Sequence, residues 1–579
     1  MKSALDARWV MRKTDANLSL MSEILNISEV MARVMANRDI RSKNTALSFL
    51  KPSIENLRPF SQMKDAQKAL IRIGKALSAR EQITVYGDYD ADGITSTVIL
   101  YKVLKRLGAR VSYYIPHRVK EGYGLNKNAV TSLAYTGTNL IITVDSGISA
   151  TEEVALAASF GIDTVIIDHH EQGDTLPQAI AVVDPKQHDC PYPFKGMCSG
   201  GLTYKLAVAL CEYMKVPFVE QQECLVLAAI ATICDIVPLR DENRILVNCG
   251  MILLNANKLI NPGLGSLLTV RGFLEKPIDT FTVGFVIGPC INASGRLDHA
   301  AKAVDLFLAG EENVMERIQL THELIELNDR RKQLTTDCVD RILSELPDEL
   351  DKILVIRDDE IHESIAGIVA GRIKESTGRP TILLTRGDEA IKGSGRSSGC
   401  YNIFEALLAH SHLFVRFGGH AMAAGLTITE ENIPLLREAL NRDCALTEED
   451  FRPQIDIDCE LPLEHVTIHL ADELSRLAPF GSGNHEPLFA SRGVYVENMR
   501  AIDDKNTLIF TFKIAGGYRV KGIAFGLNDV FNHAIEEAGV NKYGGFCMDV
   551  VYGLETNVFN GNISVQMRVR DFAVLSENN

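Results

Sequence analysis

The sequence lacks the features of secreted and membrane proteins. No stretch approaches the roughly 18 consecutive apolar residues of a membrane-spanning helix. The N-terminal stretch has basic residues, but it has no uninterrupted apolar segment and no small-residue cleavage site. The 12 cysteines include no C-x-x-C pair, and several lie within apolar runs. We therefore expect a cytoplasmic protein with reduced core thiols, no secretory signal and no membrane contact.

Positive charge is also scarce. The chain has 60 Lys and Arg residues against 75 Asp and Glu residues, a net charge of −15. This balance argues against binding of nucleic acid through a global basic field, because phosphate contacts release counterions only where Lys and Arg are clustered. A nucleic-acid partner would need a local groove or bound metals.

Repeats and several well-known catalytic motifs are missing as well. There is no solenoid-length repeat, low-complexity tract, Walker loop, GxSxG elbow, GxGxxG turn or HExxH helix. A length of 579 residues, 46% of them apolar and 23% charged, predicts a soluble globular chain of about three or four domains. Nothing indicates an oligomer, so we expect a monomer.

The order of expected strands and helices along the chain predicts an α/β fold. Short apolar strands alternate with helices from Ile83, which is typical of βαβ units and a parallel sheet. Residues 312–346 have apolar residues at helical spacing without Gly or Pro, which predicts one long helix between domains. We expect a helical cap at 1–80, a parallel-sheet domain at 81–310, the linking helix at 311–346, a smaller α/β domain at 347–448 and an OB-like β-barrel at 449–579. Either residues 1–60 or the linker could wrap the barrel.

The most informative stretch is VYGDYDADGITS at 85–96, where a strand runs into a loop before a helix. Asp88, Asp90 and Asp92 alternate there, so an extended chain places them on one side. Such a density of carboxylate oxygens suits Mg²⁺ or Mn²⁺. A solvated acidic turn is the plain alternative. The flanking strand and the missing Glu at position 12 argue against a calcium-binding EF-hand loop.

Other apolar segments also end in acidic or imidazole groups. Asp145 follows LIITV, while Asp168, His169 and His170 follow TVII, and Asp235 ends the apolar run LAAIATIC. The carboxyl ends of parallel strands meet at one sheet edge, so the side chains at the three strand ends can converge, and Asp235 is a fourth candidate. Each feature alone is weak, since paired histidines are often surface or satisfied core residues. Together they match a two-metal site for phosphoryl transfer, with ions about 3.5–4 Å apart.

These motifs resemble those of a known superfamily. DYDADG at 88–93, VDSG at 144–147, DHHE at 168–171 and the later Asp235 resemble motifs I to IV of the DHH phosphoesterases. Further phrases resemble the RecJ family within that superfamily: EGYGLN at 121–126, GPCINASGRLDHA at 288–300, HESIAGIVAGRIKESTGRP at 362–380, GSGRS at 393–397, FGGHAMAAG at 417–425 and LAPFGSGNHEPLF at 477–489. The resemblance runs from about residue 30 to the C-terminus.

The resemblance implies roles for individual residues. It makes Asp88, Asp90, Asp145, His169 and Asp235 metal ligands, with Asp92, Asp168 and His170 in the immediate shell, all of them catalytic. It implies that Arg296, Ser394 and Arg396 hold the phosphate at the 5′ end of the strand, and that Gly418, Gly419 and His420 belong to the substrate face of a DHH-associated domain. Arginine suits phosphate because its planar fork pairs bidentately with the oxygens.

Structural roles compete with some of these assignments. His420 could cap a turn, and Arg296 could form a structural ion pair. Phe510, Phe512 and Tyr518 in the last domain are more often sheet-core residues than base-stacking platforms.

As an expectation, the resemblance implies a single-stranded-DNA-specific 5′→3′ exonuclease that uses two Mn²⁺ or Mg²⁺ ions and releases 5′-mononucleotides in DNA repair and recombination. Its partner would be single-stranded DNA with a 5′ end, and a single-strand-binding protein and a helicase could recruit it. Two rival functions share motifs I to IV. One is a DHH phosphodiesterase for short oligonucleotides, cyclic dinucleotides or pyrophosphate, which the length and the C-terminal barrel disfavour. The other is a catalytically silent DHH scaffold, which would be expected to lose metal ligands.

Overall fold

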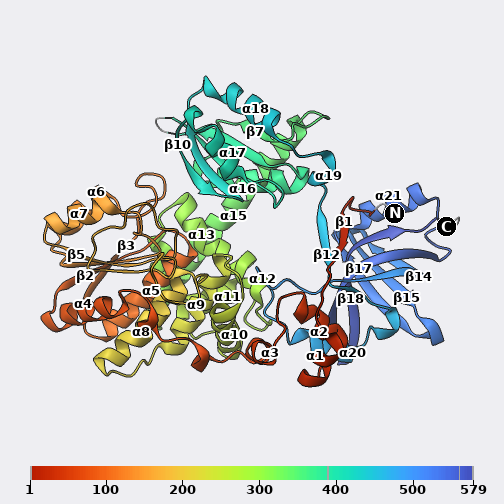
Figure 1. The fold of residues 1–579 in the computed structure, drawn as a ribbon, viewed down its shortest axis with the longest axis horizontal. Helices are drawn as coiled ribbons and strands as arrows, with labels where there is room; N and C mark the ends of the chain where they lie inside the picture. Colours follow the sequence, from red (N-terminus) through yellow and green to blue (C-terminus); the bar gives the residue numbers. More distant parts are fainter. Residues whose placement is uncertain (1–2, 388–389, 560, 577–579) are drawn as a thin grey trace. The chain divides into compact units, whose positions relative to one another are not determined.

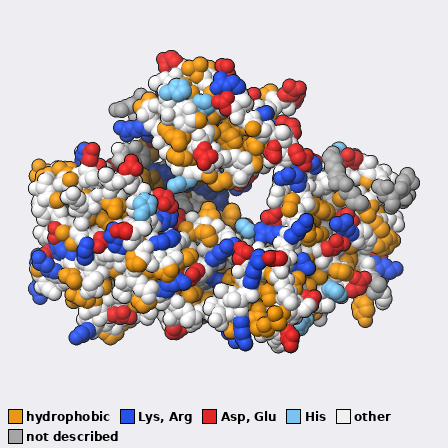
Figure 2. Space-filling model, viewed as in Figure 1, with side chains coloured by type: hydrophobic (Ala, Val, Ile, Leu, Met, Phe, Trp, Pro, Cys, Tyr) orange, Lys and Arg blue, Asp and Glu red, His pale blue; other side chains and the backbone are white. Residues whose placement is uncertain are grey.

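The structure is a computed structural model, and it describes residues 3–387, 390–559 and 561–576. The chain forms two compact units. The larger unit comprises Pro52–Ala445 and Gly481–Gly483, and the smaller unit comprises Met1–Lys51, Leu446–Phe480 and Asn484–Asn579. Among the described residues, no helix is both long and apolar enough to cross a lipid bilayer. Figure 2 shows Lys and Arg side chains interspersed with Asp and Glu on the visible face.

The larger unit begins with a five-stranded, fully parallel sheet in the order β3-β2-β4-β5-β6. Its strands are β2 (Gln82–Tyr86), β3 (Arg110–Tyr114), β4 (Leu140–Val144), β5 (Asp163–Ile167) and β6 (Ala181–Val183). The central strands are rich in β-branched residues and buried on both faces, as parallel strands require. Helices α4 (Ala66–Ala79), α5 (Ala91–Arg106) and α8 (Ser199–Met214) pack on one face, and α6 (Lys127–Tyr135) and α7 (Thr151–Ser159) on the other (Figure 1).

A helical layer follows the sheet and extends the same hydrophobic core. Its elements are α9 (Gln221–Cys234), α10 (Asp241–Ala256), α11 (Pro262–Val270), α12 (Thr280–Thr282), the π-helical turn η3 (Val283–Ile287), α13 (Gly288–Leu297) and α14 (Ala301–Leu308). Short 3₁₀ turns at Ile54–Asn56 (η1) and Phe60–Gln62 (η2) precede α4. Two of these helices lie close to the acidic segment that follows β2. Asn292 of α13 accepts a hydrogen bond from the backbone N–H of Ala91, and Asp235 at the end of α9 lies near Asp92.

Helix α15 (Val314–Glu345) leads to a second sheet in the larger unit. This sheet has the order β10-β11-β9-β8-β7, with β7 and β8 parallel and the remaining pairs antiparallel. Its elements are β7 (Leu354–Arg357), α16 (Glu363–Thr377), β8 (Thr381–Arg386), β9 (Ile391–Arg396), α17 (Ile403–Ala409), η4 (Ser411–Leu413), β10 (Phe414–His420), β11 (Ala423–Ile428) and α18 (Asn432–Asp443). The long helix and a second α/β layer are found where the pattern predicts them.

The smaller unit is built around a six-stranded sheet, five strands of which close into a barrel. The strand order is β13-β14-β15-β16-β18-β17, and an additional pairing of β14 with β17 closes the barrel. Its strands are β13 (Cys459–Glu460), β14 (Phe489–Ile502), β15 (Thr507–Lys513), β16 (Arg519–Phe525), β17 (Phe546–Phe559) and β18 (Asn562–Val574), with helices α19 (Glu448–Phe451), α20 (Ile468–Ser475) and α21 (Asn528–Ala538) and short turns η5 (Leu463–His465), η6 (Asp503–Lys505) and η7 (Ala515–Gly517).

The N-terminal segment contributes to both units. Strand β1 (Arg8–Met11) pairs in parallel with β12 (Gln454–Ile457), and helices α1 (Leu18–Leu25), α2 (Glu29–Ala36) and α3 (Lys43–Leu50) belong to the smaller unit. Residues of α2, including Met31 and Met35, are buried with the barrel core. Residues 52–80 belong instead to the larger unit. The segment expected as one N-terminal cap is therefore divided at residue 51.

The predicted fold class is confirmed: a parallel-sheet domain, a long helix, a smaller α/β domain and a β-barrel follow one another along the chain. Strands β15 and β16 pair antiparallel on either side of Gly516 and Gly517. Phe510 and Phe512 are fully buried barrel residues, as expected, whereas Tyr518 is exposed.

Candidate metal centre

Three loops at the carboxyl edge of the parallel sheet carry the acidic residues that the sequence singles out. Asp88 lies in the loop after β2, Asp145 directly follows β4, and Asp168 directly follows β5. Strands β2, β4 and β5 are parallel neighbours, so their carboxyl ends lie side by side. This is the edge at which open α/β sheets bind ligands.

The loop after β2 and the first turn of α5 hold their three aspartates in different ways. Asp90 is the N-cap of α5, and its Oδ1 accepts two backbone N–H groups of the first helical turn, at 2.9 and 3.1 Å. The buried carboxylate of Asp92 accepts the backbone N–H groups of Ser199 (2.8 Å) and Gly200 (2.6 Å) at the N-terminus of α8. Asp88 is also buried, and its Oδ1 accepts no hydrogen bond from any described residue.

Asp145 approaches the centre from β4. Its φ of 63° is left-handed, a conformation in which Asp is enriched among non-glycine residues. Its backbone carbonyl accepts the hydroxyl of Tyr123 at 3.0 Å. Within the part of the chain that the structure describes, its buried Oδ1 accepts no hydrogen bond, although His169 Nε2 lies 3.2 Å away.

The buried Asp168 pairs with the half-buried His170. Asp168 Oδ1 lies 2.7 Å from His170 Nδ1, and Oδ2 accepts the backbone N–H of Ile148 at 2.9 Å. Burial by itself raises the pKa of Asp168, but the hydrogen bond and charge of His170 outweigh burial and lower it to about 2. Burial by itself lowers the pKa of His170, but the hydrogen bond and charge of Asp168 outweigh burial and raise it to about 9. Both oxygens of Asp168 are thus occupied by protein, and the residue orients His170.

The ring of His169 faces three carboxylates. Its Nε2 lies 3.2 Å from Asp145 Oδ1, 3.7 Å from Asp92 Oδ2 and 3.8 Å from Asp235 Oδ2. Asp235 reaches this point from the C-cap of α9. Burial, and then the charge of His170, lower the pKa of His169 to about 3, so the ring is neutral and can offer a lone pair.

The described residues form three groups whose ligand atoms all lie within 4.8 Å of one another. These groups are Asp88 with Asp90 and Asp145, Asp92 with His169 and Asp235, and Asp145 with His169 and His170. Asp145 and His169 each belong to two groups. The structure therefore brings together all eight residues of the predicted acidic constellation, with Asp168 behind His170.

The pKa values of the clustered carboxyl groups show that the cluster carries repelling negative charges. Burial, followed by the charge of Asp90, raises the pKa of Asp88 well above its usual range. Burial and then Asp92 have the same effect on Asp145, and they raise the pKa of Asp235 to about 8. The carboxylates therefore repel one another in a buried space, and divalent cations would neutralise them. Oxygen and imidazole ligands suit Mn²⁺ and Mg²⁺, so the residues present fit these ions.

A cationic pocket lies beside this cluster. The cavity has a volume of about 240 Å³, and its lining residues are Tyr89, Arg118, Val119, Glu363, Ser364, Ala366, Thr385, Lys392, Gly393, Ser394, Gly425 and Leu426. Tyr89 lies between Asp88 and Asp90, and the guanidinium of Arg118 stands 4.6 Å from its ring centroid. The predicted residue Ser394 lies in the wall, on β9. Arg118 follows β3 and is not among the residues that the sequence singles out.

Arg296 and Arg396 lie close to the same pocket. Arg296, in α13, donates from Nη1 to the Ser364 carbonyl in the wall (2.8 Å). Burial, and then the charges of Arg118 and Arg331, lower the pKa of Arg296 to about 9. Burial and then Arg118 also lower the pKa of Arg396. Guanidinium groups crowded together with little solvent favour an anionic ligand.

The predicted glycine pair lies on the edge strand β10. Gly418 pairs in register with Gly425, which lines the cationic pocket. A Cβ on Gly419 would stand 2.3 Å from the Ala423 carbonyl oxygen, so the hairpin requires glycine there. His420 is exposed at the end of β10 and belongs to none of the metal-binding groups found among the described residues.

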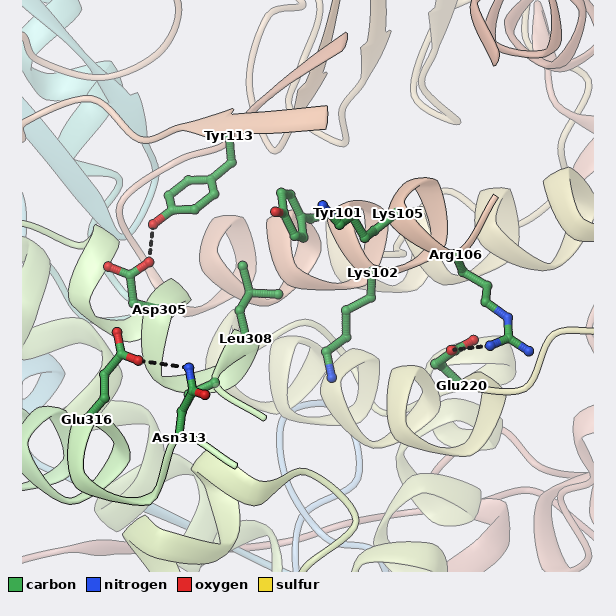
Figure 3. Close-up of a pocket in the computed structure, with 11 residues that line it drawn as sticks. Tyr101, Lys102, Lys105, Arg106, Tyr113, Glu220, Asp305, Leu308, Asn313 and Glu316 are labelled. Carbon is green, nitrogen blue, oxygen red and sulfur yellow. Dashed lines mark hydrogen bonds and ion pairs between the residues drawn. The ribbon is translucent and has the colours of Figure 1, made fainter. Parts of the chain in front are cut away.

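A second hollow of the larger unit lies along α5 towards its C-terminal end (Figure 3). Three cations there, Lys102, Lys105 and Arg106, share the lining with Glu220, Asp305 and Glu316. Arg106 lies 3.9 Å from Glu220, and the Tyr113 hydroxyl donates to Asp305. Its charges balance within the lining, so this hollow does not share the chemistry of the metal centre.

The fold and the site define a class of protein: a parallel-sheet enzyme fold whose carboxyl edge gathers ligands for divalent cations. The family models agree with this class. Residues 82–232 match the N-terminal domain of the DHH family, residues 350–445 match the DHHA1 domain, and residues 457–571 match the RecJ OB domain.

The relatives narrow the class. The chain is 35% identical to the single-stranded-DNA-specific exonuclease RecJ of Bacillus subtilis (strain 168), over 98% of this chain and 71% of that protein. It is 32% identical to the same-named protein of Escherichia coli (strain K12), over 96% of this chain and 97% of that protein. The chain belongs to the RecJ family.

Solved structures agree with this membership. The crystal structure of RecJ from Thermus thermophilus in complex with Mn²⁺ matches with a TM-score of 0.82 and 29% identity, covering 98% of this chain and 80% of that one. The Mg²⁺ complex of the same protein matches with a TM-score of 0.76 and 28% identity, covering 98% and 78%.

Proposed function

We propose that this chain is a metal-dependent, single-stranded-DNA-specific exonuclease that degrades DNA from its 5′ end and releases 5′-mononucleotides, in DNA repair and recombination. The observation that carries the proposal is the juxtaposition of two sites within one unit of a RecJ-family chain. A buried cluster of carboxylates and imidazoles lies next to a small pocket bordered by arginines. The first can hold divalent cations, and the second can hold a terminal phosphate.

The proposed metal ligands are Asp88, Asp90, Asp145, His169 and Asp235. Each belongs to at least one of the groups described above, two of which also include Asp92 or His170. When bound, two Mn²⁺ or Mg²⁺ ions supply Lewis acidity to the scissile phosphate and its attacking and leaving oxygens. Asp92 and Asp168 act mainly on their neighbours. Asp92 is fixed by the N-terminal amides of α8, and Asp168 keeps His170 in one orientation.

The direction of degradation follows from the neighbouring pocket. Arg296, Ser394 and Arg396 would bind the 5′-phosphate, and the structure adds Arg118 to this proposal because it lines the cavity and faces the Tyr89 ring. A charged phosphate held there places the first phosphodiester near the metal cluster. A strand lacking this terminal phosphate would lose the charge-assisted hydrogen bonds. Gly418, Gly419 and His420 would form the outer substrate face.

The barrel of the smaller unit carries a basic face of its own. The strand register places outward-facing residues of neighbouring strands side by side in three rows. The rows are Tyr495, Lys513 and Arg519; Asn498, Thr511 and Lys521; and Arg500, Ile509, Ile523 and Arg568. Five cations lie in these rows, and Arg519 also pairs with Glu497. We propose that this face, called here the barrel face, contacts the DNA backbone.

The same local charge explains how a chain with a net charge of −15 could bind DNA. Recruitment by a single-strand-binding protein or a helicase, action as a monomer and a cytoplasmic location stay predictions.

The test is digestion of a single-stranded oligonucleotide labelled separately at its 5′ and 3′ ends, with Mn²⁺, Mg²⁺ or EDTA. We expect metal-dependent release of the 5′ label as a mononucleotide, with a blunt duplex spared. Cleavage confined to dinucleotides would favour the short-substrate function. Binding of the strand without cleavage in any metal would favour the silent scaffold.

A further inference from the structure

Two phenylalanine rings stand in solvent on the larger unit. Phe281 in α12 and Phe285 in η3 are 61% and 63% exposed, and their rings stack with centroids 4.6 Å apart and 22° between the planes. Neither residue belongs to the motifs that the sequence singles out. Exposed aromatic surface of this kind marks contact sites in proteins.

The backbone that carries the rings packs against the C-terminal end of α9. Residues Val283–Ile287 form a π-helical turn, a rare feature that is common at functional sites. A Cβ on Gly288 would stand 2.5 Å from the Cys234 sulfur, and one on Gly284 would stand 3.7 Å from the Ile233 side chain. The turn therefore packs closely on the last turn of α9, and Asp235 is the next residue.

The same helical run continues towards the phosphate pocket. In α13, Asn292 Oδ1 accepts the backbone N–H of Ala91 in the first turn of α5 at 2.8 Å. Arg296 follows one helical turn later and contacts the pocket wall. The two rings, a proposed metal ligand and a proposed phosphate ligand thus share one packed piece of structure.

We propose that Phe281 and Phe285 form a stacking platform for bases of single-stranded DNA on the 3′ side of the nucleotide being cleaved. The inference rests on the proposed function. Unpaired bases expose their π faces and stack on aromatic side chains irrespective of sequence. The terminal nucleotide is engaged by the metals and the phosphate pocket, so the platform meets a base further along. A duplex hides these faces, and the platform thereby contributes to the preference for single strands.

The experiment combines a double variant with abasic scanning. Binding of a 5′-phosphorylated oligonucleotide is measured by fluorescence anisotropy in EDTA, with the full chain as wild type and as Phe281→Leu/Phe285→Leu. One base at a time is removed along the strand. We expect one or two abasic positions near the 5′ end to weaken wild-type binding roughly 5- to 100-fold. The same positions should have no further effect on the leucine variant.

Controls separate stacking from other effects. Phe160→Leu changes another exposed phenylalanine, at the end of α7, and should leave the abasic profile of the wild type intact. Phe285→Leu alone keeps one ring, and it serves as the variant if the double change impairs folding. Leucine keeps apolar area at both positions, so a lost profile reports the rings themselves.

Several results would overturn the proposal. One is an abasic profile that is the same in the variant and the wild type. Another is unchanged DNA affinity together with a wild-type dimer that becomes a monomer in the variant, which would make the pair an interface between copies. Digestion by the wild type with Mn²⁺ is measured in parallel. Its absence would remove the proposed exonuclease activity, while the abasic profile would still decide whether the rings bind bases.

Discussion

The aspartates of the metal centre differ in what already holds them. Asp92 accepts hydrogen bonds from two backbone N–H groups, and Asp168 is held by a backbone N–H group and by His170. Asp88, Asp145 and Asp235 instead each keep a buried oxygen without a hydrogen bond from any residue the structure describes. A buried polar atom without a partner is costly. Asp88, Asp145 and Asp235 are therefore the residues whose chemistry depends most on a cation.

At Asp145 we predict a loss of activity without a loss of fold. Asp145→Asn keeps the side-chain shape and suits the left-handed φ of 63°. It removes one charged ligand that belongs to two of the metal-binding groups. Because such a ligand helps to stabilise several kcal/mol of transition-state charge, hydrolysis should fall by about 100-fold or more. The rate of 5′-label release with Mn²⁺ measures this.

The matched control is Asp174→Asn, an exposed aspartate in the loop after β5. It should retain the wild-type rate, and circular dichroism should be unchanged in both variants. Retained hydrolysis in Asp145→Asn would exclude Asp145 from the metal site.

At Arg118 we predict a loss of selectivity for the 5′-phosphate. This side chain lines the cationic pocket, and a charge-assisted hydrogen bond contributes about 1.5–3 kcal/mol. Arg118→Ala should lower kcat/KM for a 5′-phosphorylated strand by roughly 10- to 100-fold, with a much smaller effect on a 5′-hydroxyl strand. Competition between the two substrates measures the ratio. Lys120→Ala, an exposed cation in the same loop, should leave the ratio unchanged.

Chemistry-bearing residue types can be identified from the sequence, but their division of labour cannot. Asp168 is predicted beside the metals because it follows a strand. In the structure its carboxylate is hydrogen-bonded to His170, and that contact depends on side-chain rotamers that only packing fixes. Arg118 also follows a strand of the same sheet, so the rule that selects Asp145 could have flagged it. Its proximity to Ser394 requires two segments 276 positions apart to meet.

At the scale of elements, the start of α5 leaves no room for a side chain at its third residue. A Cβ on Gly93 would stand 2.6 Å from the backbone nitrogen and oxygen of Asp88, which cannot retreat without moving the acidic loop. Gly93→Ala should lower the free energy of unfolding by about 1–3 kcal/mol, the usual cost of overpacking. Urea denaturation measures it, and hydrolysis should fall as well because Asp88 moves.

Gly173→Ala is the matched substitution, since a Cβ there meets no atom within 4 Å. Its free energy of unfolding should stay within about 0.5 kcal/mol of the wild type. Equal stabilities of the two variants would contradict the close packing at Gly93.

On the barrel face we predict an electrostatic effect on binding. Lys521 and Arg568 lie on neighbouring parallel strands, β16 and β18. If each neutralises one phosphate, the variant Lys521→Ala/Arg568→Ala should reduce the slope of log binding constant against log salt by about 1.4, because single strands release about 0.7 ion per contact. Anisotropy titrations across salt concentrations measure the slope. Lys43→Ala, at the start of α3, is the control, and an unchanged slope in the double variant would remove this face from the DNA path.

Elements with strong periodicity are those the sequence predicts best. Helix α15 and strands β2, β4 and β5 are found where expected because their apolar spacing matches one structural period throughout. The π-helical turn η3 is not predicted by the sequence pattern. Gly284 and Gly288 face the end of α9, and a local sequence pattern carries no sign of that contact.

For the whole molecule, metal binding should be coupled to stability. Like charges in the cluster oppose folding of the metal-free protein, and cations bind the folded site only. At about 100 times the dissociation constant, one bound ion adds about 2.7 kcal/mol to the free energy of unfolding. Thermal unfolding should shift upward with Mn²⁺ or Mg²⁺ relative to EDTA, and by less in Asp145→Asn.

Potassium chloride at the same ionic strength controls for screening of the repulsion. An identical melting temperature with Mn²⁺, EDTA and the salt control would contradict a cation site in the folded protein.

The sequence by itself determined the order of the layers and the chemistry of the strand ends. The spacing of hydrophobic residues and the positions of turn residues are local properties, so they can be identified from short stretches of sequence. Tertiary structure alone decided which carboxylates remain without protein partners. It also brought arginines from distant segments to one pocket and placed residues 3–51 with the barrel. The physical reason is that each of these depends on contacts between residues distant in sequence, which form only when the cores pack.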